Sequence, residues 1–296
     1  MSTLDRYGVI GFPVAHSKSP FIHGAFAQAS GQALHYEALA VAPERLPEAL
    51  AQWHAEGLRG LNVTLPHKTA VVALCETVSE RAQLAGAVNT LLRTAAGWQG
   101  DNTDGAGFLA DCDRLGIALA GQRVLLLGAG GAARGLIAPI LSRQPAHLVV
   151  SNRNPWKPEE LAERFKALGP IVPRTHLSLK GDQYDLIINA TSAGHSGALP
   201  RLPEHLLAAG GVCYDLGYGT AAEPFTQWAR AQGARLVTDG LGMLVEQAAE
   251  AFELWRGLRP DTVPVLAALR SPEPPGSGDT HRQPHKNSNP ARKGQD

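Results

Sequence analysis

Short apolar runs alternate with amphipathic stretches along most of the chain, and this alternation predicts strands that alternate with helices. The clearest unit is the segment 123–135, RVLLLGAGGAARG. Its apolar residues 124–127 have the pattern of a strand that is buried on both faces. Apolar residues then recur at helical spacing from Leu136 to Leu141, and Pro139 is expected to kink this helix. The order of strand, glycine-rich turn and helix predicts a βαβ unit.

The same pattern predicts the other elements. In the first part of the chain, strands are expected at 7–11, 36–41, 58–64, 87–93 and 98–102, and helices at 19–30, 43–56, from Pro66 onward and at 105–115. In the second part, strands are expected at 147–151, 185–190, 212–216 and 235–238, and helices at 159–168, 223–231, 241–258 and 262–269. Because strands alternate with helices, we expect parallel topology throughout.

The glycine-rich turn has the residues that a dinucleotide site requires. Residues 128–133 fit the pattern G-x-G-x-x-A, in which glycines let backbone N–H groups approach a pyrophosphate at a helix N-terminus. An NAD site would place Asp or Glu roughly 20 residues further on. Here Asn152 and Arg153 stand at that place, with Lys157 shortly after, and such cations pair with a 2′-phosphate. The predicted cofactor is therefore NADP, and the structural alternative is a tight turn followed by a solvated basic loop.

Composition is that of a soluble chain with room for two domains. The 296 residues are 44% hydrophobic and 18% charged, which is ordinary for a globular protein. Since 27 basic and 27 acidic residues cancel, neither nucleic acid nor a membrane surface is an expected partner. Cys75, Cys112 and Cys213 are widely spaced and odd in number, which predicts buried thiols in a reducing compartment and no metal site. Without a secretory or membrane-spanning pattern, we expect a cytoplasmic protein.

The composition changes after Arg270. The segment 271–296 contains five prolines and three glycines, and Ala291 is its one apolar residue. Such a segment cannot bury enough surface to offset the entropy lost on ordering. It is therefore expected to be a disordered tail.

Two ionisable residues are candidates for the chemistry. Lys68 would lie in the first turn of the helix predicted at Pro66, where the helix dipole would make an ammonium a better proton donor. A solvated lysine is the alternative. Asp104 precedes the helix predicted from Gly105, so it could be an N-cap or a ligand-facing carboxylate. Gly105 and Gly107 would permit close approach of a ligand.

Polar residues surround these two candidates. Asn62 and Thr64 shortly precede the lysine and offer it amide and hydroxyl partners, although Thr64 could be an N-cap. Ser19 is expected to cap the helix that begins there, whereas Ser17 has no such structural role. Three neighbouring side chains lack metal-ligand spacing and are expected in solvent: His16, Lys18 and His23.

Seven motifs in the chain resemble those of the shikimate dehydrogenases, NADP-dependent enzymes that reduce 3-dehydroshikimate to shikimate on the route to chorismate and aromatic amino acids. They are SKSP (17–20), NVTLPHK (62–68), GAVNT (86–90), DNTDG (101–105), GAGGAARG (128–135), NATSAG (189–194) and DGLGMLVEQ (239–247). The resemblance covers about residues 5–270 and implies two α/β domains. A discontinuous substrate-binding and catalytic domain with a mainly parallel sheet would comprise 1–104 and 241–270, and a Rossmann-type NADP-binding domain 105–240.

The resemblance also implies roles for individual residues. Lys68 and Asp104 would be the catalytic proton-transfer pair and would contact the substrate. The other substrate-binding residues would be Ser17, Ser19, Thr64, Asn89, Tyr218 and Gln247. The dinucleotide would be bound by Gly128, Ala129, Gly130, Gly131, Ala132, Asn152, Arg153, Lys157, Thr191, Leu216 and Gly240. Asn154 and Pro155 follow Arg153 where the family usually has Thr, so contact with the 2′-phosphate is expected to be weaker.

The chemistry agrees with this assignment. Hydride delivery to a ketone builds negative charge on oxygen, which a nearby ammonium can stabilise and protonate. A substrate rich in hydroxyls explains the recurrent Ser, Thr, Asn and Gln, with shikimate or 3-dehydroshikimate as the expected small-molecule partner of a monomer or homodimer. One alternative is a quinate/shikimate dehydrogenase of broader cofactor use. The other is a non-catalytic NADP-sensing protein, which would have no use for Lys68 and Asp104.

Overall fold

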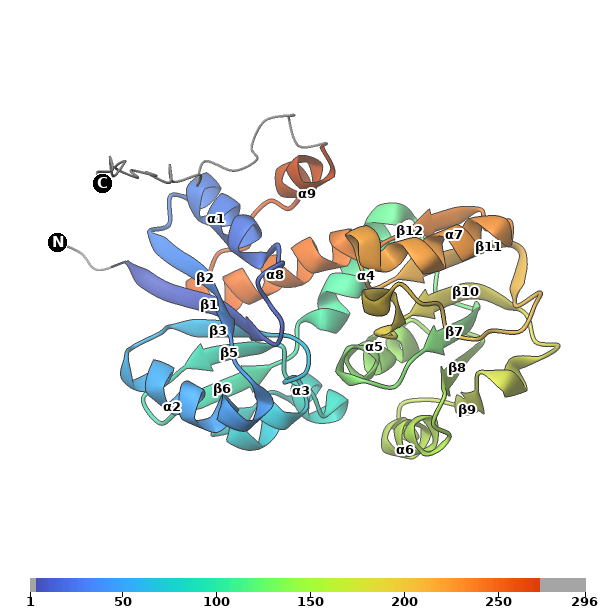
Figure 1. Cartoon of the computed structure of the whole chain (residues 1–296), viewed down its shortest axis with the longest axis horizontal. Coiled ribbons are helices and arrows are strands. Elements are labelled where there is room, and N and C mark those ends of the chain that lie inside the picture. Colours follow the sequence, from blue (N-terminus) through green and yellow to red (C-terminus); the bar gives the residue numbers. More distant parts are fainter. Residues whose placement is uncertain (1–3, 272–296) are drawn as a thin grey trace, which may run out of the picture.

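The computed structural model describes residues 4–271, which form two α/β halves lying side by side (Figure 1). Each half is built on a sheet of six strands. The expected fold class, α/β with two mainly parallel sheets, is confirmed. The prediction of a disordered tail lies, except for Ser271, outside the described residues.

The first sheet has the strand order β2-β1-β3-β5-β6-β4. Its strands are β1 (Asp5–Gly11), β2 (Leu34–Ala40), β3 (Gly60–Val63), β4 (Thr77–Val78), β5 (Thr90–Arg93) and β6 (Trp98–Asp101). Its helices are α1 (Ser19–Ser30), α2 (Leu46–Ala55) and α3 (Glu80–Ala85). The expected topology is wrong at one strand, since β5 runs antiparallel to both β3 and β6. The physical reason is the tight turn between β5 and β6, where Thr94 N–H donates to the carbonyl of Gly97 at 2.8 Å, because a parallel crossover needs about a dozen residues.

The second sheet is parallel throughout and has the order β12-β11-β10-β7-β8-β9. Its strands are β7 (Arg123–Leu127), β8 (His147–Asn152), β9 (Ile171–Thr175), β10 (Tyr184–Asn189), β11 (Leu207–Asp215) and β12 (Leu236–Thr238). Its helices are α4 (Asp104–Leu115), α5 (Gly131–Ser142), α6 (Trp156–Phe165) and α7 (Glu223–Ala231). Val124 and Leu126 enter one apolar cluster and Leu125 and Leu127 another, so β7 is buried on both faces as expected.

Two C-terminal helices cross back to the first half: α8 (Leu241–Arg256) and α9 (Val263–Arg270). Val245 and Phe252 of α8 share an apolar cluster with Ile22 and Phe26 of α1. Side chains of this size contribute about 1.5–3 kcal/mol each when fully buried, so the cluster holds α8 firmly on the first half. The same helix packs along α4, which begins where the first sheet ends. Together α4 and α8 connect the two halves (Figure 1).

The segment after Pro66 is not the α-helix that the sequence pattern predicts. It forms turns followed by a short 3-10 helix at Ala70–Leu74. The carbonyl of Lys68 accepts a hydrogen bond from Val88 N–H at 2.8 Å. This carbonyl therefore makes a tertiary contact in place of the hydrogen bond that it would accept within an α-helix. Lys68 therefore does not lie in the first turn of an α-helix, and the expected effect of a helix dipole on its ammonium group is wrong.

Apart from short 3-10 helices, the sequence pattern does not predict two strands and one helix of the described residues, namely β4, β9 and α3. Pro173 lies inside β9, and a proline removes a ladder donor, so the segment does not look like a strand. It is tolerated because β9 is at the edge of its sheet. The helix α5 continues through Pro139 to Ser142, and the expected kink stays a prediction.

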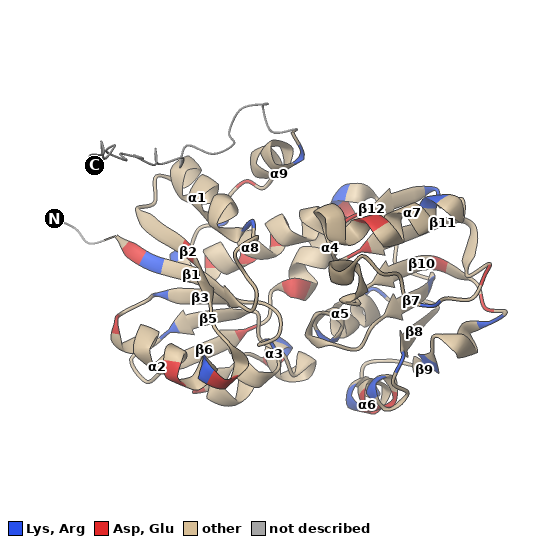
Figure 2. Cartoon of the chain, in the orientation of Figure 1, with Lys and Arg blue, Asp and Glu red and all other residues tan. Residues whose placement is uncertain are grey.

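Charged side chains are scattered over both halves, in line with the zero formal net charge (Figure 2). Within residues 4–271, no helix combines the length and the apolar character that a membrane crossing requires. The three cysteines are free; Cys112 and Cys213 are buried as expected, whereas Cys75 is only partly buried.

We expect Gly242→Ala to lower the free energy of unfolding by about 2–3 kcal/mol, because a methyl group there has no room. A Cβ built on Gly242 in α8 would lie 2.0 Å from Oδ1 of Asp111, which is fully buried in α4 and accepts a hydrogen bond from Tyr214 at 2.5 Å. Gly24→Ala in α1 is the matched control, since nothing lies within 4 Å of a Cβ built there. This substitution should raise the free energy of unfolding by at most about 1 kcal/mol, because alanine has the higher helix propensity. Denaturant titration measures both changes, and equal effects would contradict this account of the α4–α8 contact.

Candidate active site

The glycine-rich loop and Lys68 face each other at the boundary between the halves. A Cβ built on Gly131, the first residue of α5, would lie 3.0 Å from the Cβ of Lys68 and 3.6 Å from its Cδ. Gly131 belongs to the second half and Lys68 to the first. The predicted pyrophosphate loop and the predicted proton donor therefore open onto the same place, which hydride transfer between their ligands requires.

Lys68 and Asp104 form a close ion pair. Lys68 Nζ lies 2.5 Å from Oδ2 of Asp104, and the two side chains are only 14% and 5% exposed. Asn89 Nδ2 donates to the other oxygen, Oδ1, at 2.8 Å. Asp104 is not the N-cap, because Thr103 has that position and Asp104 is the first residue of α4. Its carboxylate is thus directed to Lys68 and Asn89, and partial burial strengthens the attraction.

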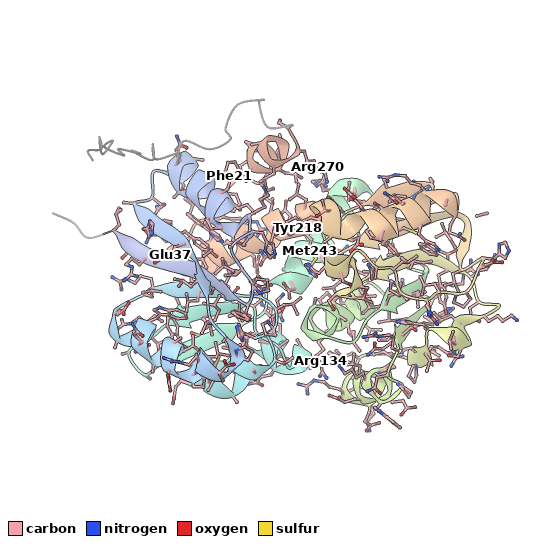
Figure 3. All side chains as sticks on the ribbon, viewed as in Figure 1. Phe21, Glu37, Arg134, Tyr218, Met243 and Arg270 are labelled. Carbon is pink, nitrogen blue, oxygen red and sulfur yellow. The ribbon has the colours of Figure 1, made fainter. Side chains whose placement is uncertain are left out.

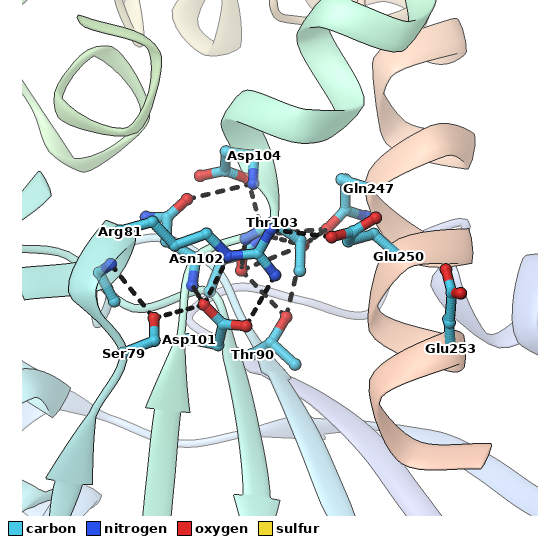
Figure 4. A network of polar contacts seen from close by, with 12 residues as sticks. Ser79, Arg81, Thr90, Asp101, Asn102, Thr103, Asp104, Gln247, Glu250 and Glu253 are labelled. Atoms are coloured by element: carbon cyan, nitrogen blue, oxygen red, sulfur yellow. Dashed lines mark hydrogen bonds and ion pairs between the residues drawn. The ribbon is translucent and has the colours of Figure 1, made fainter. Parts of the chain in front are cut away.

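Asn89 is the centre of a polar network that three segments share. Its partners Thr90, Thr103, Asp104 and Gln247 are labelled in Figure 4. Its Nδ2 also lies 2.8 Å from Thr103 Oγ1 and 3.1 Å from Gln247 Oε1 of α8. Its Oδ1 accepts from the backbone N–H of Thr103 at 2.8 Å and from the hydroxyl of Thr90 at 2.9 Å. These contacts fix the amide in one orientation, so its position relative to Asp104 is set before any ligand arrives.

The network continues into the core of the first half. Asn62 Nδ2 donates to Thr90 Oγ1 at 3.3 Å, while Asn62 Oδ1 accepts from the hydroxyl of Tyr36 at 2.7 Å. His23 Nε2 lies 3.1 Å from the same Oδ1, and the imidazole stacks on Tyr36 with ring centroids 4.2 Å apart. Burial raises the pKa of Tyr36, and a hydrogen bond with Ser19 opposes the rise. Ser19, a predicted ligand of the substrate, is thereby connected to this network.

The expectation that His23 lies in solvent is wrong, because its side chain is fully buried. Helical spacing places it beside Ile22 and Phe26 on the face of α1 that packs toward Phe252. That apolar neighbourhood is visible in the sequence and is the signal that could have identified a core histidine. Burial lowers the pKa of His23 to about 3, and the hydrogen bond that its Nε2–H donates to Asn62 Oδ1 opposes this shift.

The two serines have the reverse of their expected structural roles. Ser17 Oγ accepts a hydrogen bond from the backbone N–H of Ser19 at 3.2 Å, whereas Ser19 is not the cap of α1. The N-cap position belongs to Lys18, which is exposed like His16. Burial raises the pKa of Tyr218, and a hydrogen bond with the backbone of Lys18 opposes the rise. Tyr218 follows β11 of the second half and packs against the apolar cluster of α1 and α8. It therefore lies near the loop of residues 17–19 that leads into α1, named here the serine loop, and Figure 3 labels it at the boundary between the halves.

Gly105 and Gly107, which are expected to permit the close approach of a ligand, instead contact other parts of the protein. A Cβ on Gly105 would lie 2.2 Å from Cγ of Pro139, and one on Gly107 would lie 2.6 Å from Cβ of Gln247. The absence of side chains lets α5 and α8 approach the first turns of α4. This packing places Gln247 beside Asp104.

Thr64 lies in the turn that leads to Lys68, where its carbonyl accepts from His67 N–H at 2.9 Å. Its methyl group packs against Gly11, on which a Cβ would lie only 2.6 Å from Thr64 Cγ2. Thr64 is therefore held in place four residues before the lysine, and its contact with the substrate stays a prediction. No helix starts at Thr64, so it is not an N-cap.

The loop of residues Gly128–Ala132 fits a pyrophosphate group. Gly128 has a φ of +109°, which favours glycine, and a Cβ there would lie 2.7 Å from the carbonyl oxygen of Ala190. Gly130 is the N-cap of α5 and provides no side-chain cap, and nothing lies within 4 Å of a Cβ built on it. Backbone N–H groups at such an end attract anions, and here there is space for one.

Three further predicted cofactor residues meet at the carboxyl edge of the second sheet. A Cβ on Gly128 would lie 3.2 Å from the backbone nitrogen of Thr191. A Cβ on Gly240 would lie 2.1 Å from the carbonyl oxygen of Leu216. Leu216 N–H in turn donates to the carbonyl of Asn189 at 2.9 Å. Ligands of doubly wound sheets bind at this edge, so the loops lie where a dinucleotide is expected.

The predicted 2′-phosphate residues lie at the end of β8. Asn152 is partly buried, whereas Arg153 and Lys157 are exposed and thus accessible to a ligand. The sequence does not point to His176, which is buried at the end of the neighbouring β9. Its Nδ1 lies 2.9 Å from Ser151 Oγ, and its pKa is lowered by burial and by the positive charge of Arg153.

Comparison with known proteins gives a consistent result. Family models match at residues 9–91 (shikimate dehydrogenase substrate binding domain), 112–199 (shikimate/quinate 5-dehydrogenase) and 240–270 (shikimate 5′-dehydrogenase C-terminal domain). Relatives named shikimate dehydrogenase (NADP(+)) from Aeromonas hydrophila and Nitrosospira multiformis are 52% and 50% identical over 268 residues, which is 90% of this chain and 98% of each relative.

Solved structures agree. The Thermus thermophilus shikimate 5-dehydrogenase in complex with NADP(H) and shikimate superposes with a TM-score of 0.78 at 38% identity, covering 90% of this chain and 99% of that one. A ligand-free 5-ketofructose reductase from a Gluconobacter species has a TM-score of 0.76 at 30% identity, covering 90% and 98%.

A glycine-rich loop that faces a lysine–carboxylate pair at the boundary between two α/β halves is typical of a nicotinamide-dependent oxidoreductase, and the relatives place the chain in that class. Within that class, the family is decided by the identity of 50–52% that this chain shares with its relatives over 98% of their length. The chain belongs to the shikimate dehydrogenase family.

We expect His23 to make the fold sensitive to acid. Its pKa is about 3 in the folded chain and about 6.5 in the unfolded chain, so only the unfolded chain takes up a proton as the pH falls from 7 to 4.5. Stability present above pH 6.5 is therefore lost on acidification, by about 2–3 kcal/mol at pH 4.5.

Urea titrations of the wild type and His23→Gln at both pH values measure this effect. The glutamine variant lacks the titrating ring but keeps an amide donor for Asn62, so its loss of stability should be smaller by that amount. Identical losses in the two proteins would refute the assignment to His23.

Proposed function

We propose that this chain is an NADP-dependent shikimate dehydrogenase, which reversibly reduces 3-dehydroshikimate to shikimate with NADPH. The observation that carries the proposal is the contact of Gly131 with Lys68, where a dinucleotide loop meets an ammonium group paired with Asp104. The names of relatives at 50% identity or more support the substrate and the cofactor. The Thermus thermophilus structure was solved with both ligands and supports the same pairing.

Bound NADPH supplies the hydride. Lys68 Nζ then donates a hydrogen bond to the ketone oxygen, stabilises the negative charge that develops on it and transfers the proton. Asp104 Oδ2 holds the ammonium at 2.5 Å, and the carboxylate accepts a hydrogen bond from a substrate hydroxyl. Asn89 keeps that carboxylate in place, so little reorganisation is needed when the charge appears.

The substrate is proposed to bind between the serine loop and the polar network. Ser17, Ser19 and Tyr218 would bind its carboxylate, which is supported by the packing of Tyr218 against the apolar cluster of α1, the helix that begins at these serines. The ring hydroxyls would be bound by Thr64, Asn89 and Gln247, two of which share a hydrogen bond at 3.1 Å. Sites that read hydroxyls discriminate strongly, because a ligand without them leaves buried polar groups unpaired.

The dinucleotide is proposed to lie along the carboxyl edge of the second sheet. Residues 128–132 would bind the pyrophosphate, and Thr191, Leu216 and Gly240 would line the path to the nicotinamide. Asn152, Arg153 and Lys157 would bind the 2′-phosphate that distinguishes NADP from NAD, and the exposure of the two cations supports this role.

We also propose the division into a substrate-binding and catalytic domain, 1–104 with 241–270, and an NADP-binding domain, 105–240. The packing of α8 against α1 supports it. The zero net charge supports small molecules rather than nucleic acid as partners, and the free cysteines support a reducing compartment such as the cytoplasm. A monomer or a homodimer is proposed.

A spectrophotometric assay of the wild type with four pairs of ligands tests this function. Shikimate and quinate are each combined with NADP and NAD, and NADPH or NADH formation is followed. We expect shikimate with NADP to have the highest kcat/KM, because no carboxylate stands at the end of β8 to bind a free ribose hydroxyl. A higher kcat/KM for quinate with NAD would favour the broader enzyme, and no turnover with any pair would favour the NADP sensor.

A further inference from the structure

Asp215 is a buried carboxylate to which the proposed reaction assigns no role. It ends β11 and is 2% exposed. The next residues are Leu216, Gly217 and Tyr218, so the carboxylate stands at the base of a loop that serves both the dinucleotide and the substrate. A buried, charged group at such a place needs partners, because an unpaired buried charge is costly.

The partners of Asp215 are two hydrogen-bond donors, one in the turn that follows it and one at the end of β10. Oδ1 accepts from the backbone N–H of Gly217 at 2.7 Å, and Oδ2 accepts from Asn189 Nδ2 at 3.0 Å. Asn189 Oδ1 in turn accepts from Thr191, from the backbone N–H at 3.2 Å and from the hydroxyl at 2.8 Å. One carboxylate therefore controls the turn before Tyr218 directly and the Thr191 loop through one amide.

A third loop is joined to the same turn. The carbonyl of Gly217 accepts from the backbone N–H of Gly240 at 2.8 Å. A Cβ on Gly217 would lie 3.2 Å from Oδ1 of Asp215, so the turn is packed closely on the carboxylate. The three loops that carry the predicted nicotinamide residues thus share one hydrogen-bonded base.

We propose that Asp215 is a positioning residue that, as a carboxylate, holds the Thr191 and Tyr218 loops in the geometry that binds NADP and shikimate. The inference rests on the proposed function and adds to it a dependence on one buried charge. Asp215 is not placed in contact with either ligand.

The proposal requires the ionised form, because both groups that face the carboxylate are donors. A proton on either oxygen would point at an N–H group and break one of the two contacts. Burial raises the pKa of Asp215 to about 6, against the hydrogen bonds from Gly217 and Asn189, and the charge of Asp239 contributes to the rise. Asp239, after β12, itself lies 3.8 Å from Arg270 of α9.

Because the pKa of Asp215 is raised in the folded chain, its effects on the stability of the fold and on cofactor affinity depend on pH in opposite directions. The unfolded chain keeps Asp215 ionised down to about pH 4, so the folded chain takes up this proton first as the pH falls through 6. The contribution of Asp215 to stability therefore increases on acidification. Cofactor affinity is expected to change in the opposite direction.

The test measures the Kd of NADP+ by isothermal titration calorimetry from pH 5 to pH 8. We expect Asp215→Asn to bind about tenfold more weakly than the wild type at pH 8, since charge-assisted contacts are lost. The ratio of the two Kd values should fall toward one by pH 5, where the wild type is protonated as well. The 2′-phosphate titrates near pH 6 in both experiments, so the ratio cancels its effect.

Asp185→Asn is the matched control. Asp185 lies near the start of β10, so it is at the amino ends of the parallel strands, whereas Asp215 is at their carboxyl ends. Its carboxylate pairs with Arg123 at 2.7 Å. The variant loses the same charge, and its affinity for NADP+ should follow that of the wild type at every pH. A parallel loss in Asp185→Asn, or a ratio for Asp215→Asn that does not change with pH, would overturn the proposal.

A double variant, Asp215→Asn with Asn189→Asp, tests the positioning role directly. It exchanges the amide and the carboxylate, so every donor in the chain from Gly217 to Thr191 still meets an acceptor. We expect it to restore NADP+ affinity and the KM for shikimate to within about threefold of the wild type. Failure of rescue in a folded double variant would overturn the proposal, while turnover of shikimate by the wild type tests the proposed function separately.

Discussion

The ion pair of Lys68 with Asp104 is the interaction on which the rest of the site depends. Its two members come from different elements, a turn after β3 and the start of α4, and they meet at the boundary between the two halves. Asn89 fixes the carboxylate, and Gly131 brings the glycine-rich loop against the lysine. A charge on oxygen can be stabilised here because the donor is already held and only slightly exposed.

Close helix packing makes this meeting possible. Gly105 and Gly107 let α5 and α8 contact α4, and Gly242 makes room for the buried carboxylate of Asp111. The glycines near the ion pair of Lys68 with Asp104 therefore serve packing between the halves. The polar network extends from Lys68 to His23, so the ion pair is connected by hydrogen bonds to the core of the first half.

Much of this could be predicted from the sequence, because the strongest signals are local. The apolar run before Gly128 and the glycines after it specify a strand, a turn and an anion site within one segment. The predictions were wrong where contacts between residues far apart in the sequence determine the local structure. The carbonyl of Lys68 is bound by Val88, which prevents the helix expected at Pro66, and α1 packs His23 against Tyr36 and Phe252. Asp215 has no local signal, since its importance comes from loops that only the fold brings together.

The most direct test of the central claim is the turnover of Lys68→Ala set beside its affinity for NADP+. We expect kcat for shikimate oxidation to fall by about 10²–10⁴-fold while the Kd of NADP+ changes by less than about threefold, because the lysine serves the proton and not the dinucleotide. Lys166→Ala, at an exposed ion pair with Glu163, should leave both values unchanged. Undiminished turnover by the Lys68 variant would contradict the account.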